Sequence, residues 1–192
     1  MIFRQIFDSV SSTYTYLIAS RSGGEALLID PVLEKTDQYL RLMEQLDLQL
    51  VKVIDTHVHA DHVTAMGALR DHTNCVTVMG EQSPVDVVSM RVTDGERVTI
   101  EGINLTALYT PGHTPGSCCF LSEKFKLPLL FSGDTLFQRS IGRTDLPGGD
   151  PNLIIKSIKN RLLTLHEETN VIPGHGPLTQ IYTEKKLNPF IA

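Results

Sequence analysis

The chain has 192 residues, of which 41% are hydrophobic and 20% charged, and this composition excludes a disordered or low-complexity protein. With 17 Lys and Arg against 22 Asp and Glu, the net charge of −5 disfavours a nucleic-acid binder. No apolar run reaches the length of a membrane span, so an integral membrane protein is not expected.

Short apolar runs in the first half of the chain predict strands that alternate with helices. The strands are expected at residues 13–19, 26–29, 50–54 and 76–79. One helix is expected over residues 36–46, where Tyr39, Leu40, Met43 and Leu46 recur at helical spacing, and another over residues 61–69.

The second half predicts mostly strands, at residues 97–100, 105–109, 118–121, 127–131 and 170–172, with a turn or hairpin at Asp94-Gly95. Asp150 and Pro151 are typical of the N-cap and first position of a helix. The buried face of that helix is predicted at Ile154, Ile155, Ile158 and Leu162. This order of elements indicates an α/β protein with two sheets and with helices on the outside.

Four predicted strands end in a polar tip that carries His or Asp. The tips are Thr56-His57-Val58-His59-Ala60-Asp61-His62, Thr110-Pro111-Gly112-His113-Thr114-Pro115-Gly116, Ser132-Gly133-Asp134 and Pro173-Gly174-His175-Gly176-Pro177. Gly and Pro fix such loops and let the backbone approach a site closely.

Histidine and carboxylate ligands together suit zinc, iron or manganese. His57 and His59 alternate along an extended segment, so both can reach one ion, which His113 would complete. Asp61, His62 and His175 are expected at a second ion, and the two oxygens of Asp134 can bridge the pair.

The remaining histidines and the cysteines lack such a context. His72 and His166 are predicted to be surface residues. Cys118 and Cys119 are adjacent in a strand, so they should face opposite sides, and no catalytic role is expected for either.

The motifs resemble the signature of the metallo-β-lactamase superfamily. The resemblance rests on His57-x-His59-x-Asp61-His62, on Gly112-His113-Thr114-Pro115-Gly116, on Ser132-Gly133-Asp134 and on Gly174-His175. It implies one domain over residues 1–192, folded as an αβ/βα four-layer sandwich with the metal site at one edge, between the two sheets.

Within the superfamily, two kinds of enzyme compete. Residues 3–8, 11–18, 28–32 and 56–62 resemble glutathione-dependent persulfide (sulfur) dioxygenases, whereas residues 140–150 and 172–178 resemble short glyoxalase II-type thioesterases. Dioxygenases usually carry Phe where this chain has Leu146.

The two resemblances imply different metal contents. The dioxygenases imply one Fe(2+) per subunit, bound through His57, His113 and Asp134, with the other four candidate ligands tuning the site from outside. The thioesterases imply two Zn(2+) or mixed Zn, Fe and Mn ions bridged by Asp134, with all seven residues as ligands and Asp61 orienting the attacking hydroxide. One ligand set lies within the other, so the ligands alone leave both alternatives open.

The favoured function is oxidation of glutathione persulfide to sulfite and glutathione, and the alternative is hydrolysis of a hydroxyacylglutathione thioester. Arg139 and Arg143 are candidate contacts for the anionic glutathione, although a structural salt bridge with Asp145 or with a neighbouring loop is the stronger expectation for Arg143. A non-catalytic metal-binding protein is least favoured. A β-lactamase is disfavoured because those enzymes commonly carry Cys where Asp134 stands.

The expected partner is a glutathione-linked small molecule, with no nucleic acid and no membrane, and a homodimer is one candidate assembly. The first residues lack the basic and then apolar pattern of a signal peptide. The three cysteines are an odd number and are expected as reduced thiols. We therefore expect a cytoplasmic protein.

Overall fold

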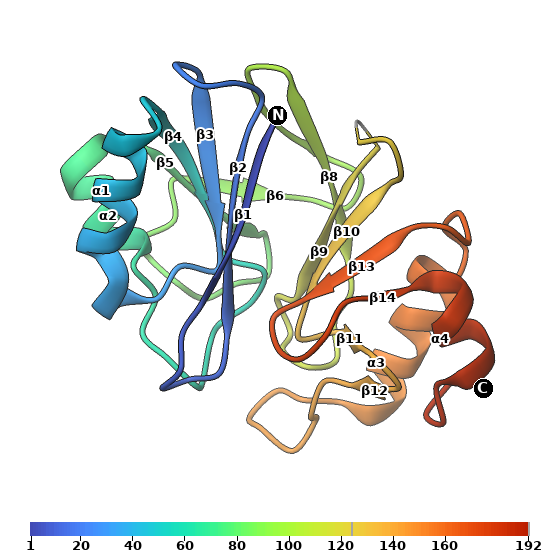
Figure 1. Cartoon of the computed structure of the whole chain (residues 1–192). Coiled ribbons are helices and arrows are strands. Elements are labelled where there is room, and N and C mark those ends of the chain that lie inside the picture. The colour runs from blue at the N-terminus through green and yellow to red at the C-terminus, as the bar shows by residue number, and fades with distance from the viewer. Residues whose placement is uncertain (124, 192) are drawn as a thin grey trace.

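Two six-stranded sheets pack face to face (Figure 1). The computed structural model describes residues 1–123 and 125–191, so Lys124 and Ala192 of the expected 1–192 domain lie outside the described residues. In spatial order, the first sheet consists of β1 (Ile2–Phe7), β2 (Tyr14–Ala19), β3 (Glu25–Ile29), β4 (Gln49–Ile54), β5 (Val76–Gly80) and β6 (Met90–Val92). The second consists of β14 (Thr179–Gln180), β13 (Asn170–Pro173), β10 (Leu129–Gly133), β9 (Cys118–Ser122), β8 (Ile103–Tyr109) and β7 (Arg97–Ile100).

Helices cover the outer face of each sheet, as Figure 1 shows. The 3-10 helix η1 (Leu33–Lys35) leads into α1 (Thr36–Gln45), which lies with α2 (Met66–Thr73) against the first sheet. On the second sheet lie α3 (Pro151–Ser157), its π-helical continuation η2 (Ile158–Leu162) and α4 (Ile181–Leu187). A small hairpin of β11 (Leu136–Phe137) and β12 (Ser140–Ile141) follows β10. The expected four-layer α/β sandwich is confirmed.

Alternating side chains along each central strand build the layers. In β2, Tyr16 and Ile18 lie in the core between the sheets, whereas Leu17 packs under the helices. In β9, Phe120 lies between the sheets and Cys119 faces α3 and η2. A strand turns successive side chains to opposite faces, so these apolar strands bury both faces.

The predicted strands are confirmed to within two residues at each end, and α1 is confirmed within one. The helix that opens at Asp150 is confirmed as well, because the Asp150 carboxylate accepts hydrogen bonds of 2.9 Å from the backbone N–H groups of Asn152 and Leu153. On this helix Ile154, Ile158 and Leu162 are buried, whereas Ile155 is only partly buried.

The helix predicted from Asp61 is wrong at its start, because α2 begins at Met66. The backbone before it is tied to the loop after β3 instead. Val63 accepts a hydrogen bond of 2.8 Å from the N–H of Leu33, and the N–H of Ala65 donates one of 2.8 Å to Pro31. These bonds hold residues 63–65 away from a helical course.

The turn at Asp94-Gly95 does not form a hairpin, because β6 and β7 belong to different sheets and the turn carries the chain from one to the other. Strands β1, β6, β11, β12 and β14 and helix α4 have no counterpart among the predicted elements. No helix in the described part of the chain is both long and apolar enough to cross a membrane.

Candidate metal centre

The four polar tips meet at one edge of the sandwich. Strands β8, β10 and β13 of the second sheet run in the same direction, so their carboxyl ends share an edge. His113 follows β8, Asp134 follows β10 directly and His175 follows β13. His57 arrives from β4 of the first sheet, so the site lies at the seam between the two sheets.

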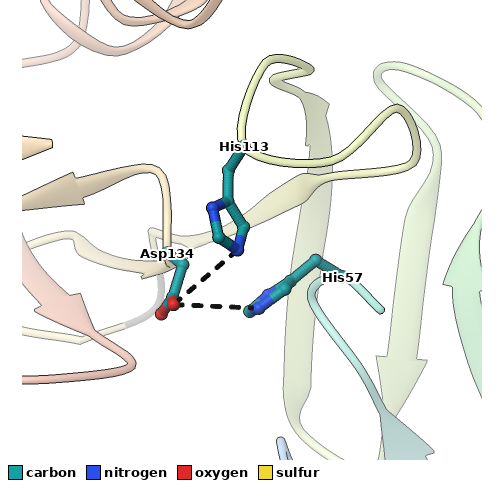
Figure 2. Close-up of side chains that lie close together, drawn as sticks. All are labelled: His57, His113 and Asp134. Carbon is teal, nitrogen blue, oxygen red and sulfur yellow. Dashed lines mark ion pairs between the residues drawn. The ribbon is translucent and has the colours of Figure 1, made fainter. Parts of the chain in front are cut away.

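His57, His113 and Asp134 form the innermost group, drawn in Figure 2. The Nε2 atoms of His57 and His113 lie 3.9 and 3.8 Å from the Oδ2 atom of Asp134. These separations are too long for hydrogen bonds, yet they are shorter than twice a metal–nitrogen bond of about 2.1 Å. One ion can therefore contact all three side chains.

Hydrogen bonds fix the tautomer of each histidine that faces Asp134. The Nδ1 atoms of His113 and His175 lie 2.8 Å from the carbonyl oxygens of Arg143 and Ser12. A carbonyl only accepts, so Nδ1 carries the proton in each ring when the ring is neutral, and Nε2 offers its lone pair.

His57 reaches the same tautomer through a longer chain of hydrogen bonds. Thr56 donates its hydroxyl proton to Asp30 over 2.9 Å, so its oxygen accepts from the Nδ1 atom of His57 at 2.8 Å. The backbone N–H of Thr56 also donates to the Asp30 carboxylate, over 2.7 Å. Asp30 thus acts on the site through Thr56.

The donor set fits a cation. Within the described residues, the Oδ1 atom of Asp134 and the Nε2 atom of His62 are buried without a hydrogen-bond partner. Buried polar atoms without a partner are costly, and a cation bound at the group to which each atom belongs would offset that cost. A Cβ atom at Gly174 would lie 2.5 Å from Oδ1 of Asp134, so the missing side chain leaves room for this carboxylate.

A second group lies beside the first and consists of His59, Asp61 and His62. Asp61 lies 3.2 Å from Nδ1 of His62 and 3.5 Å from Nε2 of His175, measured from its Oδ2 atom. His175 also lies 3.4 Å from Oδ2 of Asp134. It therefore connects the two groups through two carboxylates.

His59 takes a different place from the one expected beside His57 and His113. Its Nε2 atom lies 3.3 Å from Asp30 and 3.9 Å from Asp55, and its Nδ1 atom lies 4.0 Å from Asp61. Its ring remains close to His57, with 4.3 Å between the centroids. The ligand atoms of His59 thus group with those of Asp61 and His62, and also with those of Asp30 and Asp55.

Asp30, Asp55 and Thr56 were not predicted as site residues. Asp30 and Asp55 follow directly after β3 and β4, which are neighbouring parallel strands in register from Ile29 to Ile54. The sequence could have indicated Asp30 and Asp55 as site residues, because each is an acidic residue directly after a predicted strand. The carboxyl ends of adjacent parallel strands meet at one edge of a sheet.

Burial and neighbouring charges shift the pKa values of the site. Burial lowers the pKa of His57 to about 3, so its ring is neutral near pH 7. Burial alone would raise the pKa of Asp134, but without a metal the hydrogen bond with Asp134 raises the pKa of His175 to about 9, and this protonated ring with the nearby histidines holds the pKa of Asp134 below its usual value. Burial would likewise raise the pKa of Asp61, but the hydrogen bond from His62 and the charges of nearby histidines hold it well below its usual range. A neutral imidazole and ionised carboxylates are the forms that bind metal ions.

A cavity of about 430 Å³ opens onto the two groups. It is lined by Ala60, Asp61, His113, Asp134, Phe137, Ser140, Ile141, Arg143, Leu146 and His175. Arg143 donates two hydrogen bonds of 2.7 and 2.8 Å to the Asp145 carboxylate, so the expected salt bridge is present. Arg139 is not among these lining residues, and its backbone N–H donates to Glu184 over 2.9 Å. His72 and His166 are exposed, away from the site.

The chain is similar to proteins of one family. Residues 8–175 match the family model of the metallo-beta-lactamase superfamily. The human mitochondrial persulfide dioxygenase ETHE1 is 34% identical over 98% of this chain and 75% of its own length. The crystal structure of ETHE1 from Myxococcus xanthus has a TM-score of 0.94 and 43% identity, covering 100% of this chain and 85% of the other. The structure of TTHA1623 in a di-iron-bound form has a TM-score of 0.82 and 31% identity, covering 97% and 99%. The chain belongs to the metallo-β-lactamase superfamily.

Proposed function

We propose that the protein is an iron-dependent persulfide dioxygenase. The observation that carries the proposal is the group of His57, His113 and Asp134, in which both Nε2 atoms face one carboxylate. Two histidines and one carboxylate form the ligand set of non-haem iron(II) oxygenases, which leaves positions open for substrate and oxygen. The similarity to ETHE1 proteins supports the persulfide as substrate.

The overall reaction is RSSH + O₂ + H₂O → RSH + SO₃²⁻ + 2H⁺, in which the terminal sulfur is oxidised and oxygen is reduced. Iron(II) bound by the three residues would supply oxygen binding and electron transfer. The backbone carbonyl of Arg143 and the hydroxyl of Thr56 hold the Nε2 atoms of His113 and His57 towards Asp134, where the three residues would hold the ion. Phe137, Ile141 and Leu146 give the cavity an apolar wall.

Oxygen uptake tests the proposal. An iron-loaded sample given glutathione persulfide should consume oxygen and form sulfite, whereas a zinc-loaded sample should not, because zinc has no accessible redox state. S-lactoylglutathione should be cleaved slowly or not at all by the same iron sample. No oxygen uptake together with rapid thioester cleavage would reject the dioxygenase.

A binuclear thioester hydrolase is the second candidate, because His59, Asp61 and His62 form a second group of ligand atoms beside the first. The di-iron-bound form of TTHA1623 supports two metal positions. In this alternative Asp61 would orient the attacking hydroxide and Asp134 would bridge the two ions.

His62→Ala and His175→Ala separate the two candidates. In a one-iron enzyme both residues lie outside the ligand set, so iron should stay bound, with affinity or activity reduced about 10–100-fold. In a binuclear hydrolase each variant loses a direct ligand, so metal content should fall towards one ion per chain. Metal analysis of the purified variants, with His72→Ala as a surface control, decides between them.

A further inference from the structure

A second cavity adjoins the one that opens onto the metal-binding groups. It has a volume of about 450 Å³, within the usual range of small-molecule sites, which is about 300–1,000 Å³. Its lining consists of Val58, His59, Ala60, Gln82, Pro84, Thr114, Pro115, Gly116, Leu146 and Pro147. Ala60 and Leu146 line both cavities, so a ligand that passes these two residues can occupy both.

The lining of the second cavity is apolar and nearly uncharged. Among the described residues that form it there is no Lys, Arg, Asp or Glu, and His59 is the one titratable side chain. The described lining of the first cavity, beside the metal ligands, contains one Lys or Arg side chain, that of Arg143. Asp145 already forms a salt bridge with it. A carrier with free carboxylates, such as glutathione, therefore meets no unpaired Lys or Arg in either lining.

The walls of the second cavity are held in place. The hydroxyl of Tyr109 donates to the carbonyl of Pro115 over 2.9 Å, and Arg91 donates to the carbonyl of Val85 over 2.8 Å, beside Pro84. A Cβ atom at Gly116 would lie 2.9 Å from the backbone nitrogen of Ser83, so the two loops are in close contact. A preformed apolar cavity binds its ligand with little ordering cost.

We propose that the organic group of the substrate is apolar, and that it passes Ala60 and Leu146 to occupy the second cavity while its sulfur lies beside the metal ligands. The substrate class is thus an alkyl or aryl persulfide rather than an anionic peptide persulfide, and this rests on the proposed function. Leu146 is the specificity-determining residue at the passage.

The test compares methyl, propyl and pentyl persulfide with glutathione persulfide in the iron-loaded protein. Each buried methylene strengthens binding about fourfold, so KM should fall by about that factor per methylene along the alkyl series. Pentyl persulfide should have a lower KM than glutathione persulfide. In Leu146→Phe and Ala60→Leu, which narrow the passage, the ratio of the methyl to the pentyl KM should drop at least tenfold. Leu187→Phe, at the exposed end of α4, should keep the wild-type ratio.

A binding measurement separates this inference from the proposed function. Calorimetry with the zinc-loaded protein should show tighter binding of pentane-1-thiol than of methanethiol, and Leu146→Phe should remove the difference. If no persulfide drives oxygen uptake but this difference is present, the cavity assignment stands and the dioxygenase fails. If oxygen is consumed but glutathione persulfide has the lowest KM, or both narrowing variants keep the wild-type ratio, the apolar substrate class is wrong.

Discussion

Individual hydrogen bonds decide which nitrogen of each histidine faces the centre. The chain from Asp30 through Thr56 to His57 is buried throughout, with exposed fractions of 1%, 1% and 3%. Water does not reach the Nδ1 atom of a buried histidine, so the protein must supply the hydrogen-bond partner that selects the tautomer. Thr56 lines neither of the two cavities, so we assign it as a positioning residue for His57.

Thr56→Val tests this role, because it keeps the shape of the side chain and removes the hydroxyl. Metal affinity should fall about 10–100-fold, as it does when a hydrogen-bond partner of a ligand is lost. Thr56→Ser keeps the hydroxyl and should bind metal nearly as tightly as the wild type. Competition with a chelator of known affinity measures both variants. Equal affinity in Thr56→Val and the wild type would show that the hydroxyl does not position His57.

Short elements at the edge of the sandwich hold the ligand loops. The N-terminus of α3 lies against the turn that carries His113, since Asp150 donates its backbone N–H to Gly112 over 2.8 Å. Gly112 has a φ of 135°, and a Cβ atom there would overlap the backbone of Ile154. The cap of this helix and the position of His113 are therefore linked.

Asp150→Ala should lower the free energy of unfolding by about 1 kcal/mol, because the first turn of α3 loses its side-chain acceptor. Asp150→Asn keeps an acceptor oxygen and should stay within a few tenths of a kcal/mol of the wild type. Urea unfolding followed by circular dichroism gives both values. A loss as large in Asp150→Asn as in Asp150→Ala would assign the effect to charge rather than to the cap.

Local sequence patterns predicted the strands and helices whose own residues carry a clear apolar run or periodicity. Strand β2 and helix α1 have clear periodicity, and the four tips that end in His or Asp predicted the residues that the structure brings together. Strand β1 was missed because Arg4 and Gln5 are exposed at the edge of the sheet and interrupt any alternation. The start of α2 and the place of His59 depend on the loop after β3, which is distant in sequence. Contacts between residues that are distant in sequence cannot be predicted from the pattern of neighbouring residues.

Three apolar cores share the two sheets, one between them and one beneath each helical layer. Each central strand contributes to two of these cores, so a layer cannot separate without exposing its neighbour. We therefore propose that the chain folds as one unit, in accord with the single domain expected from the sequence.

Heating should then unfold the protein in one transition at fixed metal loading. The far-ultraviolet circular dichroism reports on the helices and sheets, and the near-ultraviolet signal reports on the tyrosines, among which Tyr16 lies between the sheets. The two curves should coincide, as expected for a single cooperative unit. Two separate midpoints would mean that the sheets unfold independently.

The cores beneath the helices also bear on how this protein can be engineered. Residues such as Leu17 and Met43 on one side and Leu130 and Ile158 on the other pack in these outer cores. They line neither of the two cavities at the ligand loops. Away from the first turn of α3, thermostabilising substitutions can therefore be concentrated there and combined with changes at the loops, because sites that share no contacts contribute nearly additively. Thermal stability and substrate specificity can then be adjusted separately in the same protein.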